Sequence, residues 1–254
     1  MRKSSPTAAA SILGFAIVMS PFADLRATEL KILAGSSLTG SLNELGPQFE
    51  RASGHKLTIH FDSTPNLIKQ TTSGEPFDLA VAPVDVFKDT AAKARFAPGP
   101  TTNIARVGYG VIVRAGTPKP DVSTPDALKQ TLLNAQSITF LPESAAGAYV
   151  LSVFGRLGIS EAMKAKTKPQ AALAQIAQAV AKGEADLGIF LVSVLIAPGV
   201  ELASPFPAEL QQELVFTAAV AADSKAAEAA KAFINYLTTP AAAAVIKAKG
   251  MNPG

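Results

Sequence analysis

The sequence predicts an α/β protein, because short apolar segments typical of buried strands alternate with segments of helical periodicity. In residues 30–49, the apolar run LKILA leads through small residues into an amphipathic helix. In residues 56–74, apolar and polar residues alternate as in a strand before a proline begins a helix. The 48% hydrophobic content of the 254 residues can fill a sizeable core, in one large domain or two smaller ones.

Residues 1–27 have the pattern of a secretory signal peptide. Met-Arg-Lys is followed by apolar and small residues, and the apolar part is short for a membrane span. We expect cleavage after Ala27, with Ala23 as the second choice, and therefore a periplasmic protein. A retained N-terminal anchor is the less favoured alternative. A lipoprotein is excluded because there is no cysteine to carry the lipid.

The composition says little in favour of a charged partner. Cleavage after Ala27 removes three basic residues and one acidic residue, which lowers the net charge from +3 to +1. No basic run with interleaved aromatic residues occurs, which argues against nucleic acid binding. Without cysteine an exported chain has no disulfides, so its stability rests on the hydrophobic core.

The first strand-to-helix loop is Gly35-Ser36-Ser37. A helix start carries free backbone amides and the positive end of the helix dipole, which together favour a negatively charged ligand. Ser36 or Ser37 can equally serve only to cap the helix, as serine commonly does. Taken alone, this loop favours the capping interpretation.

The second loop is Asp62-Ser63-Thr64-Pro65. Proline is favoured in the first turn of a helix, so we expect Thr64 to be the N-cap of a helix over Pro65–Thr72. Phe77–Ala82 then reads as a third buried strand. Two such loops at the carboxyl ends of neighbouring strands form a candidate ligand site, since open α/β sheets bind ligands at that edge.

A third loop of small residues, Pro142–Gly147, joins a strand to a helix whose apolar face includes Val150 and Leu157. The same hydrophobic patterns predict further strands and helices in the rest of the chain. Strands are expected at Val107–Val113, Ile138–Leu141, Leu187–Ile196, Val200–Ala203 and Leu214–Ala221, and helices at Pro125–Leu133, Gln170–Lys182, Ala226–Leu237 and from Pro240 to Gly250.

The order and spacing of these elements resembles the type II periplasmic solute-binding proteins, specifically the molybdate-binding group of ABC transporters. The resemblance is carried by LAGSSLTGSLNEL, HFDSTPNLIKQTTSGEPFDLAVAP, VGYGVIVRAG, PESAAGAYVLSVFGRLGI and GEADLGIF. It implies two α/β lobes, each a mixed sheet flanked by helices, joined by two crossing strands and closing on a ligand between them. The implied boundaries are residues 28–106 with 214–254 for lobe one and 107–213 for lobe two, with hinges near Val107–Val113 and Gln211–Thr217.

Members of this family hold a tetrahedral oxyanion with uncharged donors, which hydroxyls, amides and helix N-termini can provide by replacing the hydration shell. Carried over by motif, the ligand-binding groups are Ser37, Thr64 and the amide of Ala146. Ser36, Ser63 and Gly147 are further candidates in the same loops. The resemblance implies a molybdate-like oxyanion as ligand, a membrane permease as partner, no cofactor and a monomer. A small organic solute is the second choice of ligand.

Two departures from the family pattern concern the ligand. The family's ligand tyrosine is replaced by Leu191, and its acidic-aliphatic-basic turn is replaced by Lys168-Pro169-Gln170-Ala171. In addition, Asp62 is unfavourable beside a dianion. Strand alternation places Asp62 on the same face as His60, turned away from the face of Phe61. If Asp62 does face the cleft, it can accept a proton from a protonated anion, or favour a neutral or cationic ligand.

Enzyme motifs are absent from the sequence. The two histidines, His55 and His60, have no zinc-site spacing, and GSSLTG is not the G-x-S-x-G nucleophile elbow. No phosphate-binding loop or dinucleotide fingerprint occurs. We therefore expect no catalytic residue, no metal and a binding protein, for transport or for sensing. An exported hydrolase using Ser36 or Ser37 is kept as the less favoured class, and it needs a base within hydrogen-bond reach.

Overall fold

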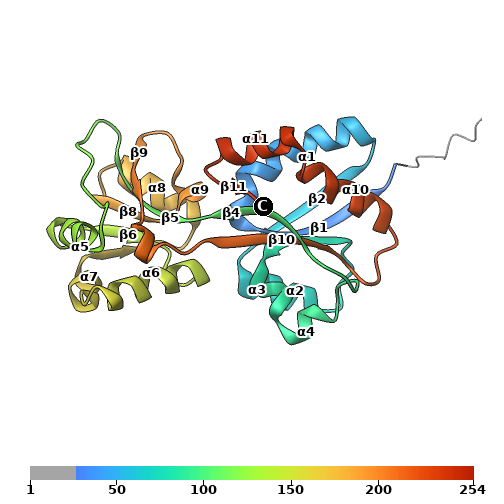
Figure 1. Cartoon of the computed structure of the whole chain (residues 1–254), viewed down its shortest axis with the longest axis horizontal. Helices are drawn as coiled ribbons and strands as arrows, with labels where there is room; N and C mark the ends of the chain where they lie inside the picture. Colours follow the sequence, from blue (N-terminus) through green and yellow to red (C-terminus); the bar gives the residue numbers. More distant parts are fainter. Residues whose placement is uncertain (1–26) are drawn as a thin grey trace, which may run out of the picture.

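The computed structural model describes residues 27–254, which form two lobes joined by two crossing segments (Figure 1). Each lobe is a mixed β-sheet with helices on both faces, which confirms the predicted α/β, two-lobed fold. The predicted signal peptide lies outside the described residues, apart from Ala27. Within residues 27–254 no helix is long and apolar enough to span a membrane.

The sheet of lobe one has six strands in the order β11-β4-β10-β3-β1-β2. β1 pairs in parallel with both β2 and β3, and β10 runs antiparallel to β3 and β4. The carboxyl ends of β1, β2 and β3 therefore meet at one edge, which faces lobe two. The strands are β1 (Glu29–Gly35), β2 (Lys56–Asp62), β3 (Leu79–Pro83), β4 (Thr102–Val107), β10 (Leu214–Val220) and β11 (Asn252–Pro253).

Helices cover both faces of this sheet, with α1, α10 and α11 on one side and α2, α3 and α4 on the other (Figure 1). α1 buries Leu42, Leu45 and Phe49, and the Phe49 ring packs 4.9 Å from that of Phe233 on α10. These buried residues form the apolar face of the amphipathic helix that was predicted within residues 30–49. The helices are α1 (Thr39–Ser53), α2 (Thr64–Thr72), α3 (Val84–Lys88), α4 (Thr90–Lys93), α10 (Ala227–Leu237) and α11 (Pro240–Ala248).

The sheet of lobe two has five strands in the order β7-β6-β8-β5-β9. Its core is built from large side chains such as Phe140, Phe154 and Phe190, all almost fully buried. The strands are β5 (Tyr109–Arg114), β6 (Ile138–Phe140), β7 (Thr167–Pro169), β8 (Leu187–Leu191) and β9 (Val200–Pro205). The helices are α5 (Pro125–Asn134), α6 (Ala145–Arg156), α7 (Ser160–Lys166), α8 (Leu173–Ala181) and α9 (Val192–Leu195).

The two crossing segments run side by side and are joined by two hydrogen bonds of one side chain, Gln211, which we call the Gln211 clip. β4 continues into β5 through Gly108, and β9 leads through a 3-10 turn (Ala208–Leu210) to β10. The Gln211 side chain accepts from the Tyr109 N–H at 2.7 Å and donates to the Tyr109 carbonyl at 2.9 Å. A Cβ on Gly108 would lie 2.8 Å from Gln211 Cδ, so only glycine permits this approach.

The structure differs from the sequence prediction in several elements. Leu187–Ile196 is not one long strand, because β8 ends at Leu191 and the chain turns into the short helix α9. A continuous apolar run does not distinguish a buried strand from a buried helix, and this run contains both. The short elements α3, α4, α7, β7 and β11 were not predicted.

Candidate functional site

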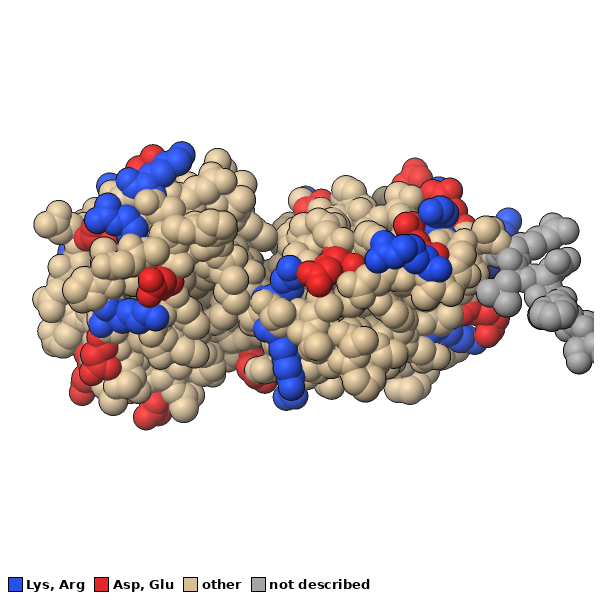
Figure 2. All heavy atoms as spheres, turned by 90° about the horizontal axis from the view of Figure 1, so that it is seen from above, with Lys and Arg blue, Asp and Glu red and all other residues tan. Residues whose placement is uncertain are grey.

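A cleft of about 950 Å³ lies between the lobes and is lined by residues of both. Seen from above, the lobes are separate bodies with a hollow between them (Figure 2). Charged side chains of both signs are scattered over this face without a continuous patch of one sign. Ser36, Ser37, Ser63, Thr64 and Ala146 all line the cleft, so the structure brings together five of the six predicted ligand-binding residues.

The first loop of lobe one follows β1. A 3-10 turn (Ser36–Leu38, η1) precedes α1, and neither the turn nor the helix is capped by a side chain. The interpretation of Ser36 or Ser37 as a helix cap is therefore wrong. Within residues 27–254, neither serine hydroxyl has a hydrogen-bond partner, and both serines line the cleft.

The second loop of lobe one follows β2 and lies beside the first, because Gly35 and Asp62 are paired at the ends of β1 and β2. Ser63, not Thr64, is the N-cap residue of α2, and it makes no side-chain capping bond. Thr64 is the first helical residue. The hydroxyls of Ser63 and Thr64 also lack a partner among the described residues. Four unpaired hydroxyls therefore gather at two neighbouring loops.

The loop before α6 contributes backbone amides from lobe two. Ser144 caps the helix, accepting from the Gly147 N–H at 2.9 Å and donating to the Leu141 carbonyl at 2.9 Å. The amides of Ala145 and Ala146 belong to the first turn, which has no intrahelical acceptor for them.

Gly147 does not line the cleft, and its amide is used by the Ser144 cap, so the structure does not support it as a ligand-binding residue. Its role is in packing, since a Cβ on it would lie 1.9 Å from the Leu141 carbonyl oxygen.

A second stretch of lobe two, residues 169–173 before α8, also lines the cleft. The amides of Ala171 and Ala172 donate to the Gln175 side chain at 3.2 and 3.1 Å. Leu191 lies in the lining and is 1% exposed, beside Phe190. Leu214 and Phe216 of the crossing strand complete an apolar floor that sequence reasoning missed, because their contact with the cleft depends on long-range pairing.

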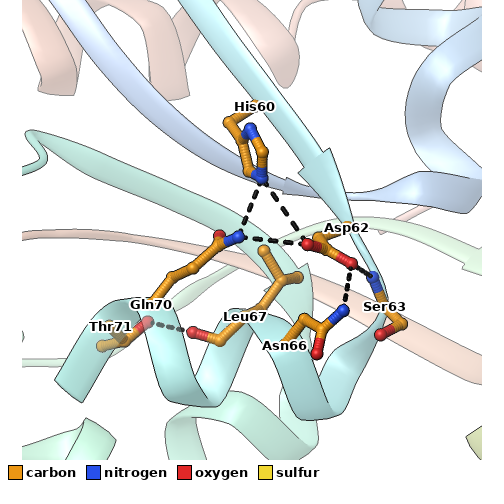
Figure 3. A network of polar contacts seen from close by, with 7 residues as sticks. All are labelled: His60, Asp62, Ser63, Asn66, Leu67, Gln70 and Thr71. Carbon is orange, nitrogen blue, oxygen red and sulfur yellow. Dashed lines mark hydrogen bonds and ion pairs between the residues drawn. The ribbon is translucent and has the colours of Figure 1, made fainter. Parts of the chain in front are cut away.

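The charges at the cleft are acidic. Asp62 and Glu143 are in the lining, and no lysine, arginine or histidine is among the lining residues described by the structure. Asp62 is held in a polar network with His60, Asn66 and Gln70 (Figure 3). Burial raises the pKa of Asp62, but hydrogen bonds from Asn66 and the Ser63 amide, together with the nearby His60 ring, outweigh it and lower the pKa.

Asn66 also lines the cleft and was missed from sequence. Its position four residues after Asp62, one helical turn away, is the signal that could have found it.

No arrangement for nucleophilic catalysis or metal binding is seen in residues 27–254. No group of three His, Cys, Asp or Glu side chains is placed to hold a metal. The His55 ring accepts from the Thr28 amide, and the His60 ring lies against Gln70 and Asp62. Over the described range, no hydrogen bond joins a histidine ring to Ser36 or Ser37.

The cleft therefore offers donors rather than cations. Hydroxyls of lobe one and first-turn amides of lobe two face one another across it, at the positive ends of helix dipoles. Such a set of donors suits an anion that is stripped of water on binding.

A model of the family described as bacterial extracellular solute-binding protein matches residues 30–252. The chain is 31% identical to an aconitate isomerase of a Pseudomonas species over 233 residues, 89% of this chain and 88% of that protein. It is 28% identical to the molybdate-binding protein ModA of Azotobacter vinelandii over 231 residues, 89% of this chain and 90% of that protein.

Among solved structures, the Azotobacter vinelandii periplasmic molybdate-binding protein superposes with a TM-score of 0.71 at 22% identity, covering 89% of this chain and 99% of that one. The substrate-binding domain of a putative molybdenum ABC transporter from Clostridium difficile superposes with a TM-score of 0.72 at 18% identity, covering 90% and 100%. At these identities the two superpositions show the shared fold.

Proposed function

The chain belongs to the bacterial extracellular solute-binding proteins, of the type II, molybdate-binding-like kind, and from that membership we propose that it delivers a small oxyanion to a membrane ABC transporter. In this proposal the chain is exported, cleaved after Ala27 and works in the periplasm as a monomer. Intact-mass measurement on protein secreted by a Gram-negative host checks the processing. A chain that keeps Met1 in the membrane fraction contradicts it.

The observation that carries the proposal is the set of unpaired donors at the cleft. Ser36, Ser37, Ser63 and Thr64 present hydroxyls without intramolecular partners among residues 27–254, and the Ala145 and Ala146 amides lie opposite. A polar group without a partner in a folded protein is commonly completed by water or by a ligand. A tetrahedral oxyanion such as molybdate has four acceptor oxygens to meet donors from both lobes, and it needs no cationic side chain if the donors converge.

A small organic acid is the second candidate, and the apolar part of the lining favours it. Leu173, Leu191 and Phe216 contact the same cleft, whose volume of about 950 Å³ leaves room for carbon as well as oxygen atoms. The relative that is 31% identical is named for action on aconitate, an unsaturated tricarboxylate. Carboxylates use the same hydroxyl and amide donors as an inorganic oxyanion.

Catalysis fits this cleft less well than binding. Isomerisation of an acid such as aconitate moves a proton between carbon atoms, which needs a base whose pKa lies near the working pH. The lowered pKa of Asp62 makes that carboxylate a weak base. A hydrolase needs a base beside its serine, and the His60 ring is directed to Gln70 and Asp62 instead.

Calorimetry on the mature protein tests the proposal. The panel is molybdate, tungstate and sulfate against citrate and the two aconitate isomers, with Ser37→Ala as the site control. Saturable binding of an oxyanion that Ser37→Ala weakens supports the proposal. Exclusive binding of the organic acids moves the assignment to the second candidate, and conversion of one aconitate isomer into the other makes the chain an enzyme. Binding that Ser37→Ala leaves unchanged places the site elsewhere.

A further inference from the structure

The carboxylate of Asp62 stands at the anion end of the cleft, directly before the hydroxyls of Ser63 and Thr64. Its side chain is 26% exposed, so it is neither buried out of reach nor free in solvent. As predicted from strand alternation, Asp62 lies with His60, yet it is also in the cleft lining. An anion bound by the neighbouring hydroxyls must therefore lie close to a second negative charge.

The carboxylate is fixed by three hydrogen bonds (Figure 3). One oxygen, Oδ1, accepts from the Ser63 N–H at 2.7 Å and from Asn66 Nδ2 at 2.9 Å. The other oxygen, Oδ2, accepts from Gln70 Nε2 at 3.0 Å, while His60 Nε2 is 3.6 Å away, beyond hydrogen-bond length. An ionised carboxylate can accept about four hydrogen bonds, so beyond these three it keeps one acceptor position.

Asn66 and Gln70 both come from α2 and hold the carboxylate in place. No lysine, arginine or histidine is among the described lining residues, and the one basic side chain paired with Asp62 is His60, 3.6 Å from Oδ2 and outside the lining. The hydrogen bonds of Asp62 favour the ionised form, so Asp62 acts as an acceptor and not as a donor.

We infer that Asp62 is a specificity-determining residue of the cleft, which selects anions that bring an O–H donor and disfavours anions that have none. This inference rests on the proposed function, namely that the cleft binds an anion. An O–H group on the ligand donates to the open acceptor position of the carboxylate and turns a repulsive contact into a charge-assisted hydrogen bond. A ligand with only acceptor atoms there meets repulsion that no donor of its own relieves.

Two sources of such a ligand share this chemistry: an oxyanion that keeps a proton, and a carboxylate with a hydroxyl group. Matched pairs separate them. In mildly alkaline buffer, arsenate keeps one proton and has the same double charge as molybdate, which keeps none. Malate differs from succinate by one hydroxyl group.

The test is calorimetry of these four ligands on the mature wild-type chain and on Asp62→Asn. An asparagine can keep the Ser63 and Asn66 bonds, and a flip of Gln70 brings its unpartnered Oε1 to the new amide, so the fold is expected to survive. Asp62→Ser is the second variant in case Asp62→Asn melts early. Glu143→Gln is the charge control, because Glu143 lines the cleft but is exposed and has no hydrogen bond or ion pair among residues 27–254.

We expect the wild type to bind the O–H-bearing member more tightly in at least one pair. A preference for arsenate over molybdate identifies a protonated oxyanion as the ligand class, and a preference for malate over succinate identifies a hydroxy acid. Asp62→Asn should weaken the O–H-bearing member about tenfold and tighten the other about tenfold, reversing the preference. Glu143→Gln should change both members by the same factor. If anions bind but Asp62→Asn shifts both members equally, the inference is overturned and the proposed function stands. If no anion binds the wild type, both are wrong.

Discussion

The two lobes meet the cleft with different chemistry. The rim of lobe one consists of side chains, namely the hydroxyls of Ser36, Ser37, Ser63 and Thr64, with Asp62 beside them. The hydrogen-bond donors of lobe two are mainly backbone amides, because its residues at the helix starts are alanines, its one lining serine, Ser144, is committed to capping α6, and Gln170 donates to Thr139. Lobe one can therefore change specificity by single substitutions, whereas lobe two offers amides that no alanine substitution removes.

This contrast decides which experiments are informative. Side-chain truncation removes the free donors of lobe one but not the backbone amides of lobe two, so an alanine scan would underestimate the contribution of lobe two. Removing a lobe-two donor requires proline, which lacks the N–H and is tolerated in the first turn of a helix.

The largest effect is expected from removing two hydroxyls of lobe one together. In Ser37→Ala/Thr64→Ala, each lost bond to a charged ligand should cost roughly 1.5–3 kcal/mol, so affinity should fall by roughly a hundredfold to ten-thousandfold. Calorimetry with the best ligand found measures this. Ser152→Ala, whose hydroxyl bonds within α6 at an exposed position, is the control and should bind normally. Unchanged affinity in the double variant would place the anion outside the lobe-one loops.

A smaller loss is expected from the backbone of lobe two. Ala146→Pro removes one amide of the first turn of α6, and affinity should fall about tenfold to a hundredfold. Ala146→Gly keeps the amide and should change affinity by less than about threefold. Equal losses in the two variants would mean that Ala146 contributes its methyl group rather than its N–H.

A side-chain hydroxyl added to lobe two tests the difference between the two lobes from the other direction. Leu191→Tyr should tighten an inorganic oxyanion by about twofold to tenfold, since a neutral hydrogen bond contributes roughly 0.5–1.5 kcal/mol. Leu191→Phe has the ring without the hydroxyl, and it controls for overpacking at a position that is 1% exposed. If the ligand is an organic acid in contact with Leu191, both variants should lower its affinity. Competition binding of the oxyanion against the organic acid on each variant distinguishes these two outcomes.

The smallest effect concerns stability against acid. The folded pKa of Asp62 is below the ordinary aspartate value of 3.8, so the contribution of Asp62 to folding is complete above that pH. It is lost as the pH falls through the lower folded pKa. Urea unfolding from neutral to acid pH should show a steeper loss of stability for the wild type than for Asp62→Asn below about pH 4. Parallel curves would mean that the network in Figure 3 does not form in solution.

Much of this arrangement could be predicted from local sequence. The strand-loop-helix units around Ser37 and Thr64 are encoded by nearby residues, and the period of two in β2 placed Asp62 with His60. Two kinds of assignment were less accessible. Whether Ser36 caps a helix, or Ser144 uses the amide of Gly147, depends on the exact loop geometry, which residue types alone do not specify. The contribution of Phe216 depends on a crossing strand more than a hundred residues away from the first loop.

The Gln211 clip between the crossing segments has a consequence for the cost of binding. Because one side chain bonds both the N–H and the carbonyl of Tyr109, neither segment can twist independently without breaking both bonds. The Tyr149 hydroxyl, which donates to the Leu210 carbonyl at 2.7 Å, ties the same segment to α6. We expect two linkers joined in this way to bend together and to resist sliding past each other, which restricts the relative orientations of the lobes before a ligand binds. Less conformational entropy is then lost on binding, and more of the interaction energy remains as affinity.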